Sequence, residues 1–144
     1  MPHLTGSYGS RGAILDIWIG VSEPRARVLR AKRLEVPQPI KLPFLIDTGA
    51  DSSMVSEDTM RHLGIPDRGA RMIVGSTTRI EPTSCPTYDV QFELRTYGDQ
   101  PLTFPALEVI GRPFFNEMIY GLIGRDVLNR VQLRFGQGRF RIDY

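Results

Sequence analysis

Apolar and polar side chains alternate along four short stretches of this chain. Residues 13–19 (AILDIWI) place four apolar side chains on one face, and residues 88–94 (YDVQFEL) alternate without a break. Residues 131–135 and 139–144 repeat the pattern on either side of a Gly-Gln-Gly sequence. Because a two-residue period is typical of strands with one buried face, we predict a β-strand in each stretch. The last two should form a hairpin around the glycines.

A helix is predicted over residues 57–63. Ser56 stands in the N-cap position, acidic side chains occupy the first turn, basic ones including His62 occupy the last, and Gly64 ends the segment. These charges agree with the helix dipole at both ends. A second, shorter helix is expected at about residues 126–130.

The remaining chain is interrupted by prolines, which disfavour long helices. We therefore expect a small all-β domain with one or two short helices over residues 13–144. Residues 1–12 are rich in glycine and serine and are expected to form a flexible N-terminal arm. The length of 144 residues is that of a single domain.

The composition excludes several kinds of site. Cys85 is the only cysteine, so no disulfide can form within the chain, and we expect this thiol to be a small buried side chain. One cysteine and two histidines cannot by themselves complete a tetrahedral zinc site, and we expect neither a metal nor a cofactor. No secretory signal and no membrane-spanning apolar run are visible, so we expect a cytoplasmic location and no membrane partner.

The formal net charge of +2 is too small to indicate nucleic-acid binding by itself. Five basic residues nevertheless cluster between residues 25 and 33. We interpret the segment that carries them, between Ile19 and Ile40, as an exposed loop or hairpin with a solvated basic face. A nucleic-acid partner for this cluster is the alternative, which we do not favour.

Residues 44–53 (FLIDTGADSS) are the candidate for chemistry. An apolar strand leads into Asp47, and the small residues that follow predict a tight turn presenting the carboxylate. Gly49 would let backbone amides approach that carboxylate or a substrate. An Asp-Thr-Gly tripeptide also arises by chance, so alone it is a weak signal. The sequence lacks the signatures of serine hydrolases, P-loop proteins and zinc peptidases.

A second segment, residues 119–128 (IYGLIGRDVL), strengthens this signal. It places two apolar residues and Gly124 before a short predicted helix, and Gly124 lies 77 residues after Asp47. Together the two segments resemble the retropepsin-like aspartic proteases, the single-domain family that includes the retroviral enzymes. The resemblance implies a closed β-barrel-type domain that assembles as a two-fold homodimer. Its partners would be a second copy of itself and a peptide or protein substrate.

The resemblance assigns the catalytic role to Asp47, Thr48 and Gly49. The Asp47 carboxylates of two subunits would activate a water molecule that hydrolyses a peptide bond. Thr48 would hydrogen-bond across the dimer axis, and Gly49 would supply backbone groups to the carboxylates and substrate. The resemblance also makes Ile123, Gly124 and Arg125 structural, and we expect an ion pair between Asp51 and Arg125 to brace the loop.

Substrate binding is expected along the same loop and on a hairpin over residues 71–83. The residues that the resemblance assigns to it are Ala50, Asp51, Val74, Gly75, Ser76 and Thr77. The last four would close over an extended substrate, although the glycine-rich flap of the retroviral enzymes is not reproduced here. Substrate preference is therefore open.

Two further expectations concern assembly and activity. The C-terminal hairpin over residues 131–144 is expected to contribute to the dimer sheet, with its terminal strand presenting an open edge, and removing residues 139–144 should abolish dimerisation. The alternative to a peptidase is a non-catalytic module that keeps the same fold and serves dimerisation or peptide binding.

Overall fold

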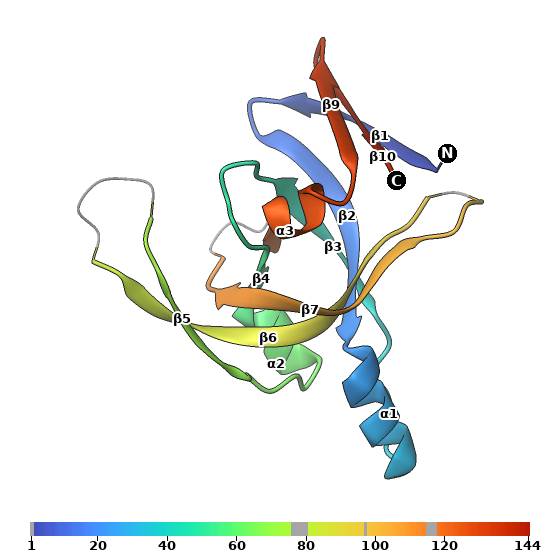
Figure 1. The fold of residues 1–144 in the computed structure, drawn as a ribbon, viewed down its shortest axis with the longest axis vertical. Helices are drawn as coiled ribbons and strands as arrows, with labels where there is room; N and C mark the ends of the chain where they lie inside the picture. The colour runs from blue at the N-terminus through green and yellow to red at the C-terminus, as the bar shows by residue number, and fades with distance from the viewer. Residues whose placement is uncertain (1, 76–80, 97, 115–117) are drawn as a thin grey trace.

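The computed structural model describes residues 2–75, 81–96, 98–114 and 118–144. Figure 1 shows their arrangement. The strands are β1 (His3–Gly9), β2 (Gly12–Val21), β3 (Ile40–Ile46), β4 (Met54–Ser56), β5 (Gly69–Ile73), β6 (Thr83–Leu94), β7 (Leu102–Arg112), β8 (Gly121–Ile123), β9 (Gln132–Gly136) and β10 (Arg139–Asp143). The helices are α1 (Glu23–Ala31), α2 (Glu57–His62) and α3 (Arg125–Leu128).

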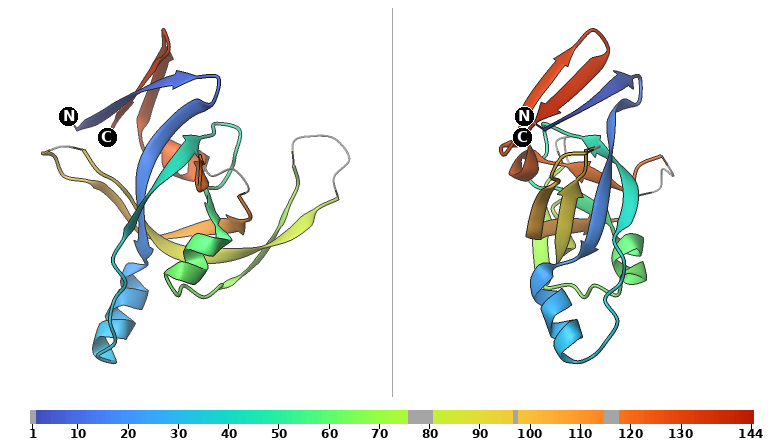
Figure 2. Two further views of the ribbon diagram at one scale, coloured as in Figure 1. Left: turned by 180° about the vertical axis from the view of Figure 1, so that it is seen from behind. Right: turned by 90° about the vertical axis from the view of Figure 1, so that its right-hand side faces the viewer.

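Six strands close into a β-barrel. Their order is β6-β7-β4-β8-β3-β2, and pairing of β2 with β6 completes the ring. The β3–β8 and β4–β7 pairs are parallel, whereas the other neighbours in the ring are antiparallel. Strand β5 lies outside the ring beside β6, and β1, β10 and β9 extend the sheet from β2 (Figures 1 and 2). The all-β expectation is confirmed.

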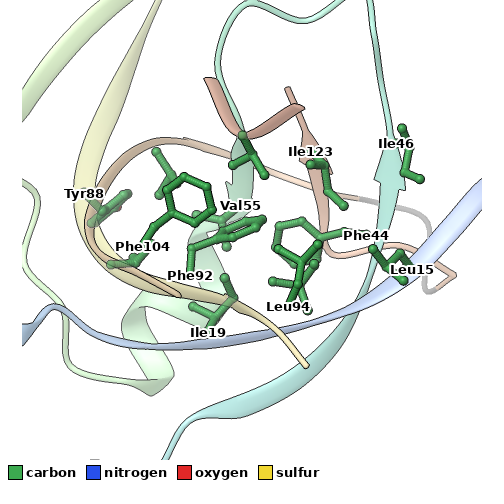
Figure 3. Close-up of a cluster of buried hydrophobic side chains, with 14 of the residues drawn as sticks. Leu15, Ile19, Phe44, Ile46, Val55, Tyr88, Phe92, Leu94, Phe104 and Ile123 are labelled. Carbon is green, nitrogen blue, oxygen red and sulfur yellow. The ribbon is translucent and has the colours of Figure 1, made fainter. Parts of the chain in front are cut away.

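The barrel encloses an aromatic and aliphatic core. Phe92 on β6 packs edge-on against Phe44 of β3 at 5.6 Å between ring centroids, and against Phe104 of β7 at 6.2 Å (Figure 3). Such edge-to-face pairs add to the free energy gained by burying the rings. Alternate residues of β2, including Ile17 and Ile19, are fully buried in the same core, as the two-residue period predicts. Through Phe44, the core therefore fixes β3, the strand that leads to Asp47.

The strands predicted at residues 13–19 and 88–94 are confirmed within β2 and β6, and the predicted C-terminal hairpin is confirmed as β9 and β10. Helix α2 coincides with the helix predicted over residues 57–63, and α3 begins one residue before the second predicted helix. Cys85 is buried, as expected.

The segment between Ile19 and Ile40 differs from the expected loop or hairpin because residues 23–31 form α1. Ser22 caps the helix by accepting a hydrogen bond from the backbone N–H of Arg25 at 3.3 Å. Pro24 lies in the first turn, where its missing N–H costs nothing. Ala26 is the buried residue of α1, and the helix projects from the barrel at the end of β2 (Figure 2). The described residues thus contain a third helix, beyond the one or two expected.

The N-terminus also differs from the flexible arm expected over residues 1–12. Residues His3–Gly9 form β1, which pairs along its length with β10 and at its end with β2. Strand β10 consequently lies between β1 and β9 and has no open edge. Among the described residues β9 pairs only with β10, so its outer edge is unpaired at this end of the sheet.

No helix in the described ranges is both long enough and apolar enough to cross a membrane.

Candidate active site

The two sequence segments of interest meet at the ends of β3 and β8. These strands run parallel, with Leu45 opposite Leu122 and Ile46 opposite Ile123. The backbone N–H of Asp47 then donates to the carbonyl of Ile123 at 3.0 Å. Asp47, which is half-buried, therefore leaves the barrel at a position fixed by a strand far away in the sequence.

The turn after β3 holds the Asp47 carboxylate by a local hydrogen bond. The backbone N–H of Gly49 donates to Asp47 Oδ1 at 2.9 Å, and the N–H of Ala50 donates to the Asp47 carbonyl at 3.2 Å. A Cβ at Gly49 would lie 3.2 Å from the same Oδ1, so a side chain there would crowd the carboxylate. Thr48 and Gly49 are exposed beside it.

Arg125, the first residue of α3, fastens this turn from the other side. Its guanidinium forms an ion pair with Asp51, which confirms the expected Asp51–Arg125 contact, and donates to the carbonyl of Thr48 at 2.9 Å. The backbone N–H of Arg125 also donates to the carbonyl of Ala50 at 2.9 Å. One residue thus binds three positions of the loop.

A buried network that sequence reasoning missed lies beneath the loop. Ser53 is fully buried, and its Oγ donates to Asp126 Oδ1 at 2.7 Å and accepts from the backbone N–H of Gly124 at 3.0 Å. The Ser53 N–H donates to Asp126 Oδ2 at 2.8 Å. The only sequence signal was a serine and an aspartate at the ends of the two segments, and nothing local shows that they meet.

Gly124 is required at this point for space. A Cβ there would lie 2.6 Å from the backbone carbonyl carbon of Ser52, closer than real Cβ atoms approach backbone. Ile123, the residue before it, is fully buried in the core. The sequence expectation that both residues are structural agrees with this packing.

A cleft of about 790 Å³ runs from the Asp47 loop to β5. Asp47, Gly49, Ala50 and Asp51 line one side, and the other side includes residues 71–75. The predicted hairpin over residues 71–83 is supported by antiparallel pairing of β5 with β6, which places Ile73 opposite Thr83. Val74 and Gly75 follow β5 and are exposed along the cleft, whereas Ser76 and Thr77 lie outside the described residues.

The cleft has further lining residues that the sequence did not predict. They come from the loop before β4, from β4, β7 and β8, and from the segment after β7, and are Ser52, Met54, Ile110, Arg112, Pro113, Phe114 and Leu122. Strand β4 pairs in parallel with β7 and antiparallel with β8, and this brings Met54 beside both Ile110 and Leu122. Their place in the cleft depends on these long-range pairings, which no local pattern reveals.

The arrangement suits acid–base chemistry by a carboxylate. A half-buried carboxylate held by a backbone N–H faces an elongated cleft large enough for a peptide segment. Among the described residues, no three His, Cys, Asp or Glu side chains are grouped as metal ligands.

Comparisons with known proteins identify a family and a fold for this chain. The family model described as aspartyl protease matches residues 34–127. Among solved structures, the chain is similar to a retropepsin-like aspartic protease from Rickettsia conorii, with a TM-score of 0.60, 14% sequence identity, and coverage of 99% of this chain and 91% of that chain. At this identity the likeness shows the fold alone, which is retropepsin-like.

Two other solved structures are similar to the chain at lower TM-scores. The EIAV protease complexed with the inhibitor HBY-793 has a TM-score of 0.48 and 15% identity, with coverage of 87% of this chain and 93% of that chain. The retroviral protease-like domain of Ddi1 from Leishmania major has a TM-score of 0.40 and 15% identity, with coverage of 86% and 82%. No curated protein matches the sequence.

Proposed function

The chain belongs to the aspartyl protease family, and from this premise we propose that it is an endopeptidase whose active site forms between two copies of the chain. The observation that carries the proposal is the Asp47 loop, where the carboxylate is held by Gly49 at the edge of a peptide-sized cleft. The sequence contains a single Asp-Thr-Gly. A pair of catalytic carboxylates therefore requires a second subunit, related by a two-fold axis.

The reaction proposed for the two Asp47 carboxylates needs one proton shared between them. Two carboxylates in one site cannot both ionise, so one is ionised and the other protonated. The ionised carboxylate takes a proton from a water molecule, whose oxygen attacks the peptide carbonyl carbon. The protonated carboxyl group transfers its proton to the carbonyl oxygen, and a tetrahedral diol forms. Proton transfer to the amide nitrogen then breaks the C–N bond, and no covalent enzyme intermediate is formed.

The neighbouring residues take roles that follow from their positions in this proposal. Thr48 is exposed beside Asp47, where it can reach the second subunit, and Gly49 presents backbone groups to the carboxylate and to substrate. Ala50 and Asp51 line the cleft and bind the substrate backbone. Val74 and Gly75, at the end of β5, are proposed to bind an extended substrate; the sequence assigns the same role to Ser76 and Thr77, which lie outside the described residues.

Cleavage of an unbiased peptide library tests the proposal, with wild type beside Asp47→Asn at several pH values. We expect cleavage by the wild type and a loss of at least about a thousandfold in the variant, because Asn cannot accept the proton of water. Cleavage by both proteins would place the activity elsewhere. Absence of cleavage by either, at concentrations where sedimentation shows a dimer, would favour the alternative of a non-catalytic dimerisation or peptide-binding module.

A further inference from the structure

Four charged side chains line the cleft, and three of them have an evident role or partner. Asp47 is the proposed catalytic group, and Asp51 is paired with Arg125. Arg71 donates to Ser52 Oγ at 3.1 Å and lies 3.2 Å from Glu108 in an ion pair. The fourth charged side chain is Arg112.

Arg112 is the last residue of β7, and no carboxylate among the described residues compensates its charge. The side chain is half-buried, and its Nη1 donates to the Sγ of Cys85 at 3.2 Å. A neutral thiol is a weak acceptor, and a guanidinium has five N–H donors. Among the residues that the structure describes, no carboxylate lies within ion-pair distance of Arg112.

The walls around Arg112 favour the binding of a negatively charged ligand group beside its guanidinium. Ile110 and Pro113 are its near neighbours in the chain, and Met54, Phe114 and Leu122 complete an apolar lining. Apolar walls lower the local dielectric, so a carboxylate beside the guanidinium would be attracted more strongly than in water. A planar guanidinium also matches a carboxylate with two parallel N–H···O bonds.

We infer that Arg112 forms a substrate subsite that binds a peptide carboxylate, so that the cleft prefers peptides carrying Asp or Glu near the cleaved bond. This inference rests on the proposed function, because it assigns a preference to the same cleft. The carboxylate at a peptide C-terminus has the same chemistry and is the other source of such a ligand. An Asp or Glu side chain is the source that the proposed endopeptidase favours, because an endopeptidase cleaves within a chain and away from its C-terminal carboxylate.

The test compares wild type, Arg112→Gln, Arg112→Lys and Arg27→Gln on peptides blocked at both ends. Each peptide carries Glu or Gln at one position, and a matched set has a free C-terminus. Arg27 lies on exposed α1 away from the cleft, so Arg27→Gln is a control for the loss of one positive charge. We expect wild type and Arg27→Gln to have about tenfold higher kcat/KM on the Glu peptides. Arg112→Gln should lose this ratio because its kcat/KM falls more on the Glu peptides than on the Gln peptides, and Arg112→Lys should retain part of the ratio.

Three results would overturn the inference. The first is equal kcat/KM of wild type on Glu and Gln peptides, and the second is an equal loss on both in Arg112→Gln with its thermal unfolding unchanged. The third is a preference that requires the free C-terminus, which would make the C-terminal carboxylate the ligand.

A binding measurement separates this inference from the proposed function. Peptides from a blocked library are captured on Asp47→Asn and on the Asp47→Asn/Arg112→Gln double variant, and the bound fractions are sequenced. Enrichment of Asp and Glu by the first protein and not by the second supports the subsite even if wild type cleaves nothing. Equal composition in both bound fractions contradicts it.

Discussion

Among the side-chain contacts that hold the Asp47 loop, the Asp51–Arg125 ion pair and the Ser53 hydrogen bonds differ in how far water reaches them. The Asp51–Arg125 ion pair is exposed, with 86% of the Asp51 side chain accessible. Exposed ion pairs contribute roughly 0–1 kcal/mol. Ser53 is fully buried, and its hydroxyl satisfies both Asp126 and the Gly124 N–H. Because buried polar groups that lose a partner are costly, the loop depends more on Ser53 than on the ion pair.

Ser53→Ala tests this ranking. The substitution leaves the Gly124 N–H without its acceptor and removes a donor to Asp126, so we expect the free energy of unfolding to fall by about 2 kcal/mol. Ser52→Ala is the matched control, because Ser52 Oγ accepts one hydrogen bond from exposed Arg71 and should cost about 0.5 kcal/mol. Urea unfolding of both variants measures the difference, and equal losses would contradict the ranking.

At the scale of elements, the sequence predicted what local patterns encode. Strands such as β2 and β6 have a buried face, so their apolar side chains alternate visibly. Helix α1 buries mainly Ala26, so it has no apolar stripe to reveal it, although Ser22 and Pro24 were usable signals for a helix start. Strand β1 is held by backbone pairing with β10 while most of its side chains are exposed, and its sequence therefore resembles that of an arm.

The candidate site also contains residues that local sequence predicts and residues that it does not. The Asp-Thr-Gly turn and Arg125 belong to contiguous motifs and could be predicted, including their ion pair. Arg112 and Ile110 reach the cleft only because β4 pairs in parallel with β7. Such register is decided by packing between distant segments, and a single sequence does not contain it in readable form.

The sheet formed by β1, β10 and β9 should respond to acid. Arg141 donates a hydrogen bond to Asp143 at 2.8 Å, and this bond holds the pKa of the Asp143 carboxyl group below its ordinary value. Because the folded-state pKa lies below the unfolded one, the stabilisation is complete above the unfolded pKa of about 3.9 and is lost as the pH falls through the folded value. We expect wild type to lose stability as the pH falls below about 4.

Asp143→Asn identifies the source of that acid sensitivity. The variant should be less stable than wild type at pH 6 and should show a shallower decline at low pH, because Asn does not titrate. Denaturant unfolding across this pH range measures both slopes. Parallel curves for the two proteins would mean that other carboxyl groups dominate.

At the scale of the whole molecule, the proposed dimer needs a surface that is free in one copy. Deleting residues 139–144 would remove Phe140 and Ile142, both of which are buried in the core, so loss of a dimer after that deletion would not identify the interface. Phe135 on β9 is a sharper probe. It is 48% exposed, contacts the ring of Tyr8 edge-on at 5.5 Å, and lies on the strand with the unpaired edge.

Phe135→Glu is expected to raise the dimer dissociation constant at least about tenfold and to reduce peptidase activity in proportion to the dimer lost, because charged side chains disfavour edge pairing and apolar burial. Sedimentation equilibrium and activity over a dilution series measure both quantities. Val28→Glu, at a 51% exposed apolar position on α1, should leave dimerisation unchanged. A dimer of unaltered affinity in Phe135→Glu would place the interface on another face.

The parallel pairing of β3 with β8 also sets when the Asp47 loop can form during translation. The backbone N–H of Asp47 donates to Ile123. The backbone carbonyls that follow Asp47 in the loop accept hydrogen bonds from Arg125 and Asp126. During translation the loop is made long before these residues, so the growing chain at first lacks the groups that hydrogen-bond to it. The loop therefore reaches its folded conformation only after residues 121–126 have left the exit tunnel, long after Asp47 itself has emerged.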